Sequence, residues 1–330
     1  MTNARPKAVA VTRILNEDDI VEAFVRHHAV LVDHHLFLDN GSTDRTLEIL
    51  KSLQDEGLEI TVCQNRTPFF TEVSYNTSLF RQARAMFSAE WVVFLDTDEF
   101  IDPRPISGDL RGWLGGMPNA LNCVSLSSFT YFDLPDDDPA QLVVPLRMRS
   151  RERLTKQPIA KVIVRAALAE KGVTIDAGQH QAIHPDGPIE RFSDHEVSLG
   201  HFYRRSAGQA ISKAVMGHLK VLAAGQQERD KNRSTHYRHV FNLARDSPEN
   251  LSSIGFLTPT YTSEDLVLDP LPYLGGSLRY TRYDDPFYKA VRVLVAYAEQ
   301  LAENHGRFID TNLGVRLQAE QSTAAWTILF

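Results

Sequence analysis

Three acidic side chains lie within four residues at the end of a short apolar run. Asp96, Asp98 and Glu99 follow residues 91–95, and an apolar run of this length is typical of a buried central strand. Open α/β sheets bind ligands at the carboxyl ends of such strands. Neighbouring carboxylates repel one another, and a hard cation such as Mg²⁺ or Mn²⁺ relieves that repulsion. The junction therefore indicates a metal site, with a solvated acidic turn or a helix N-cap as the alternative.

Strand and helix patterns alternate over the first hundred residues, and these elements have to position the acidic junction. Short apolar runs predict strands at residues 8–12, 36–38, 60–63 and 91–95. Apolar residues at helical spacing predict helices between them, at residues 20–31, 47–53 and 75–88. Helical crossovers of this length are right-handed and join parallel strands. The fold class is therefore α/β, with a mostly parallel central sheet flanked by helices.

A second acidic strand end is found at Asp39, where a turn containing Gly41 begins. Parallel strands end at the same edge of a sheet, so Asp39 and Asp96 could contact two ends of one nucleotide. No GxGxxG follows the first strand and no GxxxxGK[ST] occurs, so a dinucleotide dehydrogenase or a P-loop kinase lacks its phosphate-binding loop. A metal ion has to hold the phosphates instead.

The composition excludes several classes of protein. The 330-residue chain has a net charge of -7, which argues against a general nucleic-acid binder. Cys63 and Cys123 belong to no disulfide or zinc pattern. No signal peptide and no apolar run of ~18 residues are found. We expect a cytoplasmic protein with at most a peripheral contact at the inner face of the membrane, and a homodimer stays open.

Several residue blocks resemble a known family. Residues 11–17, 24–28 and 38–46 resemble the start of a family 2-type glycosyltransferase of the GT-A (nucleotide-diphospho-sugar transferase) fold, and residues 93–100 resemble its DxD motif. Within that group they are similar to a branch with a DxDEF motif related to galactan synthases. Weaker similarity continues at residues 161–165, His180, residues 201–206 and Lys213. The resemblance implies transfer of a sugar from a nucleotide diphosphate sugar to an acceptor hydroxyl.

The resemblance also implies which residues hold the nucleotide. Asp39 would contact the base, and the residues lining the base and ribose pocket would be Thr12, Arg13 and Glu17. For Glu17 the alternative is that it only supplies charge to a helix N-terminus. The cations that could hold the diphosphate are Lys161 and Arg204.

A metal site is implied at the DxDEF block. Asp98 would coordinate Mn²⁺ or Mg²⁺ directly, while Asp96 would approach the ribose or metal-bound waters. His201 would complete the site, with His180 as a further candidate, and nitrogen ligation favours Mn²⁺. For both histidines the alternative is a structural role.

The family resemblance favours an inverting reaction, which needs a carboxylate base near the acceptor oxygen. The candidates are Asp194, Glu196 and Asp133, with Asp194 ranked first. No QxxRW sequence occurs, so we expect a non-processive enzyme using a UDP-linked donor, with a carbohydrate or glycolipid acceptor, in surface polysaccharide or glycoconjugate synthesis. The alternatives are a sugar-1-phosphate nucleotidyltransferase and a catalytically silent nucleotide- or sugar-binding module.

The chain changes character after about residue 205. We expect a GT-A nucleotide-sugar-binding and catalytic domain over residues 1–205. Helical spacing at residues 210–222, 235–245 and 286–303 predicts a mainly helical C-terminal region, residues 206–330, packing on the acceptor side. The apolar residues 326–330 are expected to dock on the body of the protein, with a dimer contact or a lipid-linked acceptor as alternatives.

Overall fold

A computed structural model describes residues 6–66, 72–153, 161–189, 191–230, 235–252 and 265–317. In these residues one sheet has ten strands, and its first half is parallel. The parallel strands lie in the order β3-β2-β1-β4. Their bounds are β1 (Ala8–Ile14), β2 (His34–Asp39), β3 (Ile60–Gln64) and β4 (Trp91–Phe94), and the helices that connect them are α1 (Val21–His28), α2 (Thr46–Asp55) and α3 (Glu72–Phe87). This arrangement confirms the predicted α/β fold.

Helices cover both faces of the parallel strands. Alternate residues of β1 belong to different apolar clusters: Ala10 packs with Phe24 of α1, and Val11 with Phe80 of α3. A strand buried on both faces has to be apolar along its whole length. This requirement explains why the first strands appear in the sequence as uninterrupted apolar runs rather than as alternating patterns.

Beyond β4 the sheet becomes mixed. Strand β8 (Lys161–Arg165) is antiparallel to β4, β6 (Cys123–Phe132) is antiparallel to β8, and β12 (Arg191–His201) is parallel to β6 and antiparallel to β5 (Glu99–Ile101). The start of β8 and the end of β12 therefore meet the edge at which β4 ends. Beyond β6 the sheet continues with β7 (Ser150–Glu152) and ends at β13 (Leu266–Leu268). A small separate sheet contains β9 (Thr174–Ile175), β10 (Ala182–His184) and β11 (Gly187–Pro188).

Short helices fill the connections of the mixed half. They are α4 (Leu110–Gly115), α5 (Val144–Arg147), and the 3₁₀ turns η1 (Ala166–Lys171), η2 (Ala177–Gln179) and η3 (Pro248–Ser252). No helix in the described part of the chain is long and apolar enough to cross a membrane.

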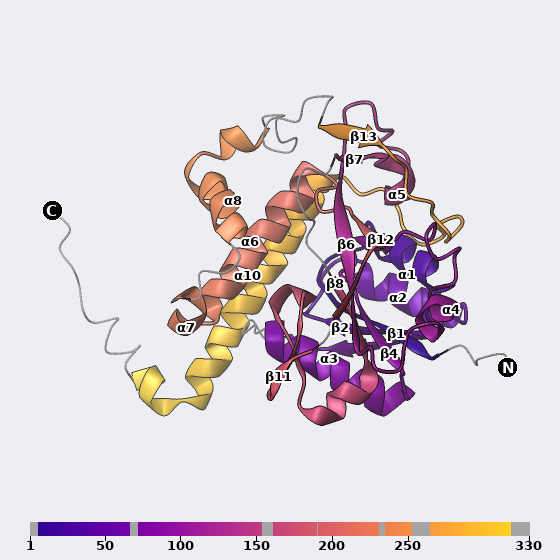
Figure 1. The fold of residues 1–330 in the computed structure, drawn as a ribbon. Helices are drawn as coiled ribbons and strands as arrows, with labels where there is room; N and C mark the ends of the chain where they lie inside the picture. The colour runs from indigo at the N-terminus through magenta and orange to yellow at the C-terminus, as the bar shows by residue number, and fades with distance from the viewer. Residues whose placement is uncertain are drawn as a thin grey trace.

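The C-terminal part forms a helical layer beside the sheet (Figure 1). Its helices are α6 (Ala207–Ala223), α7 (Gln226–Asp230), α8 (Thr235–Asp246) and α10 (Pro286–Thr311). Helix α6 lies against α10 and α8. At Gly208 an added Cβ would lie 2.0 Å from the carbonyl oxygen of Pro286, so the close approach of α6 to α10 depends on this glycine. The three predicted C-terminal helices correspond to α6, α8 and α10.

Helix α10 contacts the loops that follow β1 and β2. Lys289 forms an ion pair with Asp18 and lies 3.4 Å from Asp44, and Gln300 packs against Gly41. These loops are on the side where the sequence predicts the nucleotide. The position of the whole C-terminal region on the acceptor side stays a prediction, and residues 326–330 lie outside the described residues.

Candidate active site

The acidic junction forms a tight turn between β4 and β5. The backbone N–H of Glu99 donates to the carbonyl oxygen of Asp96 at 3.0 Å, and the backbone N–H of Asp96 donates to Glu99 Oε2 at 3.0 Å. The turn lies at the carboxyl edge of the parallel strands. Two neighbouring strands bring partners to it: β8 starts at Lys161, and β12 places His201 opposite Glu99.

Lys161 neutralises the first aspartate of the junction. Its ammonium donates to Asp96 Oδ2 at 2.7 Å and lies 3.5 Å from Glu99 Oε2. Burial opposes ionisation of Asp96, yet the charge of Lys161 holds the pKa of this carboxyl below its usual range. Burial raises the pKa of Glu99 to about 7, against the pull of the same lysine. The buried lysine therefore relieves part of the repulsion within the junction.

Asp98 is surrounded by groups from the end of β12 and from α6. Its carboxylate is only 2% exposed. Lys213 donates to Oδ2 at 2.6 Å and Arg205 Nη1 lies 3.8 Å from the same oxygen, whereas Oδ1 faces His201 Nε2 at 3.6 Å. Burial opposes its ionisation, but Lys213 and its neighbours hold the pKa of Asp98 below the usual value. Burial lowers the pKa of His201, which favours the neutral imidazole that binds metals.

Glu17 lies in this cluster. Arg205 Nη2 donates to Glu17 Oε2, and Lys213 lies 3.3 Å from Glu17 Oε1. Arg205 also donates to Asp19 at 2.7 Å. The sequence predicts Glu17 in the base and ribose pocket, but the structure places its carboxylate among the cations that contact Asp98.

Asp39 is buried and has a full set of local hydrogen bonds. Its carboxylate accepts from the N–H groups of Gly41 and Ser42, at 3.0 Å and 3.1 Å, and from the side-chain amide of Gln64 at 2.8 Å. Gly41 adopts φ +93°, a conformation that suits glycine. These bonds hold the turn after β2, so a nucleobase contact at Asp39 requires one of these donors to move.

The remaining predicted nucleotide residues lie beside this turn. Thr12 is 1% exposed, and within the described residues its hydroxyl oxygen has no hydrogen-bond partner. Arg13 Nη1 lies 3.4 Å from Glu72 Oε1. An orphaned hydroxyl at the end of β1 is a feature that a ligand could satisfy.

The predicted four-residue metal set does not come together in the structure. Among the described residues no three His, Cys, Asp or Glu side chains gather as a metal-binding group. The ring of His180 packs over Gly178, and the backbone N–H of His180 donates to Asp176 Oδ1 at 2.7 Å. The neighbouring residue, Gln179, instead accepts a hydrogen bond from Lys161 at 3.0 Å.

A smaller ligand pair remains, and it fits a divalent cation. Two atoms that both lie ~2.1 Å from one cation are about 3 to 4 Å apart, and Asp98 Oδ1 and His201 Nε2 are 3.6 Å apart. Lys213 and Arg205 both approach Oδ2 of Asp98, so Oδ1 is turned toward His201. Mg²⁺ and Mn²⁺ sites with few protein ligands are completed by substrate phosphates and water.

The predicted base candidates lie in two places. Asp133 is paired with Arg147 at 3.3 Å, and burial raises the pKa of its carboxyl. Asp194 and Glu196 lie in β12, which pairs with β6, but their side chains are outside the described part of the chain. Of the three candidates, only the side chain of Asp133 is described, and its partner is Arg147 rather than a residue of the Asp98 cluster.

Sequence reasoning gave no role to several cations of this edge. Arg205 contacts Asp98, whereas the predicted Arg204 has its guanidinium 5.5 Å from the ring of Tyr203. Lys213 belongs to one of the residue blocks that resemble the glycosyltransferase family, and this similarity is the feature of the sequence that points to it. Lys220, two helical turns further along α6, is buried, and burial lowers its pKa to about 8.

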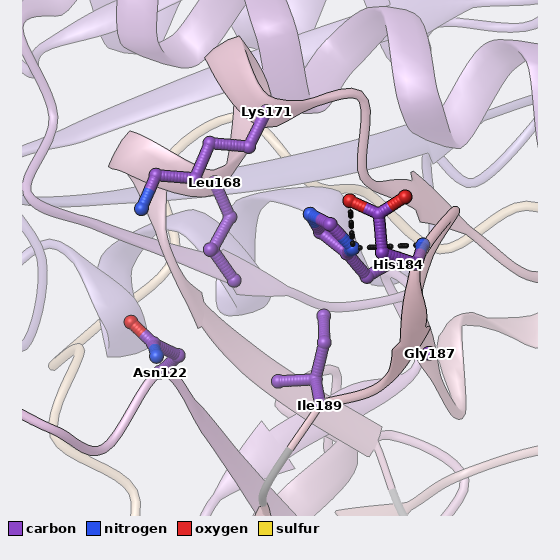
Figure 2. A pocket seen from close by; sticks show the side chains of 7 residues that line it. Asn122, Leu168, Lys171, His184, Gly187 and Ile189 are labelled. Carbon is purple, nitrogen blue, oxygen red and sulfur yellow. Dashed lines mark hydrogen bonds and ion pairs between the residues drawn. The ribbon is translucent and has the colours of Figure 1, made fainter.

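A hollow of about 270 Å³ lies at the opposite edge of the sheet (Figure 2). It is lined by Asn122, Leu168, Lys171, His184, Asp186, Gly187 and Ile189. The carbonyl oxygen of Asn122 accepts from the N–H of Arg165, which lies opposite the first residue of β4. The hollow is therefore remote from the acidic junction at the other end of that strand.

Comparisons with known proteins agree with the resemblance. The model of glycosyl transferase family 2 matches residues 11–108, and no curated protein matches the sequence. A solved structure of the mannosyltransferase PcManGT from Pyrobaculum calidifontis, in complex with GDP-Man and Mn²⁺, is 12% identical with a TM-score of 0.40, covering 92% of this chain and 80% of that one.

A second solved structure is glucosyl-3-phosphoglycerate synthase from Mycobacterium tuberculosis with Mn²⁺, UDP and glucosyl-3-phosphoglycerate. It is 16% identical with a TM-score of 0.35, covering 67% of this chain and 80% of that one. The family match includes both acidic strand ends. Residues 11–108 therefore match the family that the sequence resembles, while the galactan synthase branch stays a prediction.

Proposed function

We propose that the protein is a metal-dependent, non-processive glycosyltransferase that moves a sugar from a UDP-linked donor to a hydroxyl of a carbohydrate or glycolipid acceptor. The observation that carries the proposal is the pair formed by Asp98 and His201, whose facing atoms are 3.6 Å apart at the carboxyl edge of the sheet. The family match over residues 11–108 supports the reaction class. A role in surface polysaccharide or glycoconjugate synthesis rests on the resemblance alone.

The residues at this edge of the sheet would have different roles in binding the donor. Asp98 Oδ1 and His201 Nε2 would hold Mn²⁺ or Mg²⁺, which when bound supplies the positive charge that stabilises a departing diphosphate. Lys161 stays buried against Asp96, so Asp96 remains ionised and can accept hydrogen bonds from a ribose or from metal-bound water. Lys161 and Arg205 keep the acidic cluster from repelling an anionic substrate.

The nucleoside would lie across the ends of β1 and β2. The Thr12 hydroxyl and the Asp39 turn are the polar groups there, and Thr12 has a hydrogen bond to give. For the acceptor, an inverting reaction uses a carboxylate base, and Asp194, Glu196 and Asp133 remain the proposed candidates.

A screen of nucleotide sugars with and without Mn²⁺ tests this proposal. We expect one UDP-sugar to raise the unfolding midpoint in the presence of Mn²⁺, because a ligand at about 100 times its Kd adds about 2.7 kcal/mol to stability. The same donor should show Mn²⁺-dependent hydrolysis or transfer, measured as released UDP.

Two outcomes would contradict the proposal and name its alternatives. UDP binding that Mn²⁺ does not enhance, with no turnover of any donor, would indicate a silent binding module. Formation of a nucleotide sugar and pyrophosphate from a sugar 1-phosphate and a nucleoside triphosphate would indicate a nucleotidyltransferase.

A further inference from the structure

Lys213 bridges two buried carboxylates from outside the sheet. It lies on α6, whose N-terminus is capped by the Ser206 hydroxyl. Its ammonium contacts Asp98 Oδ2 at 2.6 Å and Glu17 Oε1 at 3.3 Å. The lysine side chain is 28% exposed, whereas the side chains of Asp98 and Glu17 are 2% and 8% exposed. Lys213 therefore stands at the solvent side of the cluster.

The second cation of the cluster is held much more firmly. Arg205 is 1% exposed and donates to Asp19, to Glu17 and to the carbonyl oxygen of Phe202. A guanidinium with several partners in a rigid fork cannot leave without breaking all of them, whereas a lysine ammonium moves on a flexible four-carbon chain. Of these two cations, Lys213 is the one that can change partners.

A divalent cation at Asp98 would compete with this ammonium. Both would share one carboxylate, and like charges a few ångströms apart in a buried site repel strongly. A nucleotide diphosphate beside the metal would bring the negative charge that the lysine needs. The ammonium of Lys213 lies 5.9 Å from the centroid of the Tyr203 ring, and Tyr203 is partly exposed.

We propose that Lys213 is a transferable counter-ion. Without substrate it neutralises Asp98 and weakens binding of a divalent cation. When the nucleotide diphosphate arrives, the ammonium moves to a phosphate oxygen and Asp98 becomes available to the metal. Metal and nucleotide then bind cooperatively through this residue. This inference rests on the proposed function, because it assumes that Asp98 is a metal ligand.

The test measures Mn²⁺ affinity in the absence of turnover. Free Mn²⁺ is followed by electron paramagnetic resonance in titrations of the wild type, Lys213→Met and Lys213→Arg, each with and without UDP, after subtraction of the Mn²⁺ that UDP alone binds. Lys171→Met is the matched control, because this lysine lines the hollow at the other edge of the sheet (Figure 2).

We expect Lys213→Met to bind Mn²⁺ about tenfold more tightly than the wild type without UDP, the change that removal of one competing charge contact gives. The gain in Mn²⁺ affinity on adding UDP should be about tenfold smaller than in the wild type. Lys213→Arg and Lys171→Met should behave like the wild type without UDP. A purely structural lysine would not make metal binding tighter on removal.

An unchanged or weaker Mn²⁺ affinity of folded Lys213→Met without UDP would overturn the inference. Circular dichroism establishes that each variant folds. If Lys213→Met does not fold, Lys213→Gln replaces it, because glutamine keeps a hydrogen-bond donor but carries no charge. Failure of the proposed function gives a different result: the wild type itself would then bind no Mn²⁺ with UDP present.

Discussion

Asp39 is the last residue of β2 and Asp98 follows β4 at the same edge of the sheet, yet their carboxylates have different kinds of partner. Asp39 accepts hydrogen bonds from the backbone of its own turn and from Gln64 on the next strand. Asp98 is contacted by Lys213 and His201, more than a hundred residues further along the chain. Backbone N–H groups of its own turn are among the donors to Asp39, whereas the groups named around Asp98 are all side chains.

This difference separates a structural carboxylate from one that can take a ligand. Backbone N–H groups cannot leave Asp39 without opening the turn, and opening it would leave buried polar groups unpaired. A lysine side chain can leave Asp98 by rotation about its own bonds. The same residue type at the same kind of position can therefore serve two purposes, depending on its partners.

The largest effect is expected at Asp98. Asp98→Asn keeps the shape of the side chain but removes the charge that would hold a metal, so kcat/KM should fall about a thousandfold, as on loss of a main electrostatic group. The matched control is Asp102→Asn, a buried aspartate after β5 that is paired with Arg104. Steady-state release of UDP measures both. A loss below tenfold for Asp98→Asn would remove it from the metal site.

The next effect is a loss of stability at Asp39. Asp39→Ala removes the acceptor for several buried donors, so the free energy of unfolding should fall by about 2 to 4 kcal/mol. Urea unfolding followed by fluorescence measures it, with Asp98→Asn as the variant expected to lose less. If Asp39→Ala is as stable as the wild type but no longer binds UDP, Asp39 is a nucleobase ligand rather than the residue that holds its turn.

The local part of this comparison could be predicted from the sequence. Apolar runs placed the ends of β2 and β4, so Asp39 and Asp98 were found at the same edge, because burial on both faces leaves a clear pattern. The partners of Asp98 could not be found in this way. Lys213 reaches it through the packing of α6 on α10, and no local pattern records which of the two adjacent arginines at 204 and 205 faces inward.

The sequence also left open the role of residues for which several local roles were plausible. Glu17 reads equally well as the start of a helix and as a ribose contact, and its position depends on Arg205, which is far away in the chain. Strand β8 pairs antiparallel with β4, and β12 pairs antiparallel with β5. These long-range pairings bring Lys161 and His201 to the junction, and periodicity alone carries no information on them.

Three buried histidines form a third kind of buried titratable group. They are packed against aromatic rings rather than held by a backbone turn or by a cation. His27, His28 and His35 pack around Phe24 and Phe100. Burial lowers the pKa of His27 to about 4 and that of His35 to about 3, and it holds the pKa of His28 well below the usual value. The folded protein keeps these rings neutral, while the unfolded chain takes up protons below about pH 6.5.

Stability should therefore fall as the pH drops through this range. Each such histidine costs about 2 kcal/mol between pH 7 and pH 5, because only the unfolded state gains its proton. In His35→Phe, the drop in unfolding free energy from pH 7 to pH 5 should be about 2 kcal/mol smaller than in the wild type. Any change in packing affects the stability equally at both pH values and does not alter this difference. Urea unfolding at both pH values measures it, with the exposed His305→Phe as control. An equal loss in wild type and His35→Phe would contradict the assignment.

The smallest effect is expected at Thr12, whose hydroxyl has no partner in the described structure. Thr12→Val keeps the shape and removes that hydroxyl, so stability should change by less than about 0.5 kcal/mol, while UDP affinity should fall about five- to tenfold, the value of one hydrogen bond. Thr46→Val is the matched control, because its hydroxyl accepts from the N–H of Glu17 at 2.8 Å. It should lose stability and keep its affinity for UDP. Calorimetric titration with UDP and urea unfolding together separate the two patterns, and a Thr12→Val variant that binds UDP like the wild type would move the nucleoside away from the end of β1.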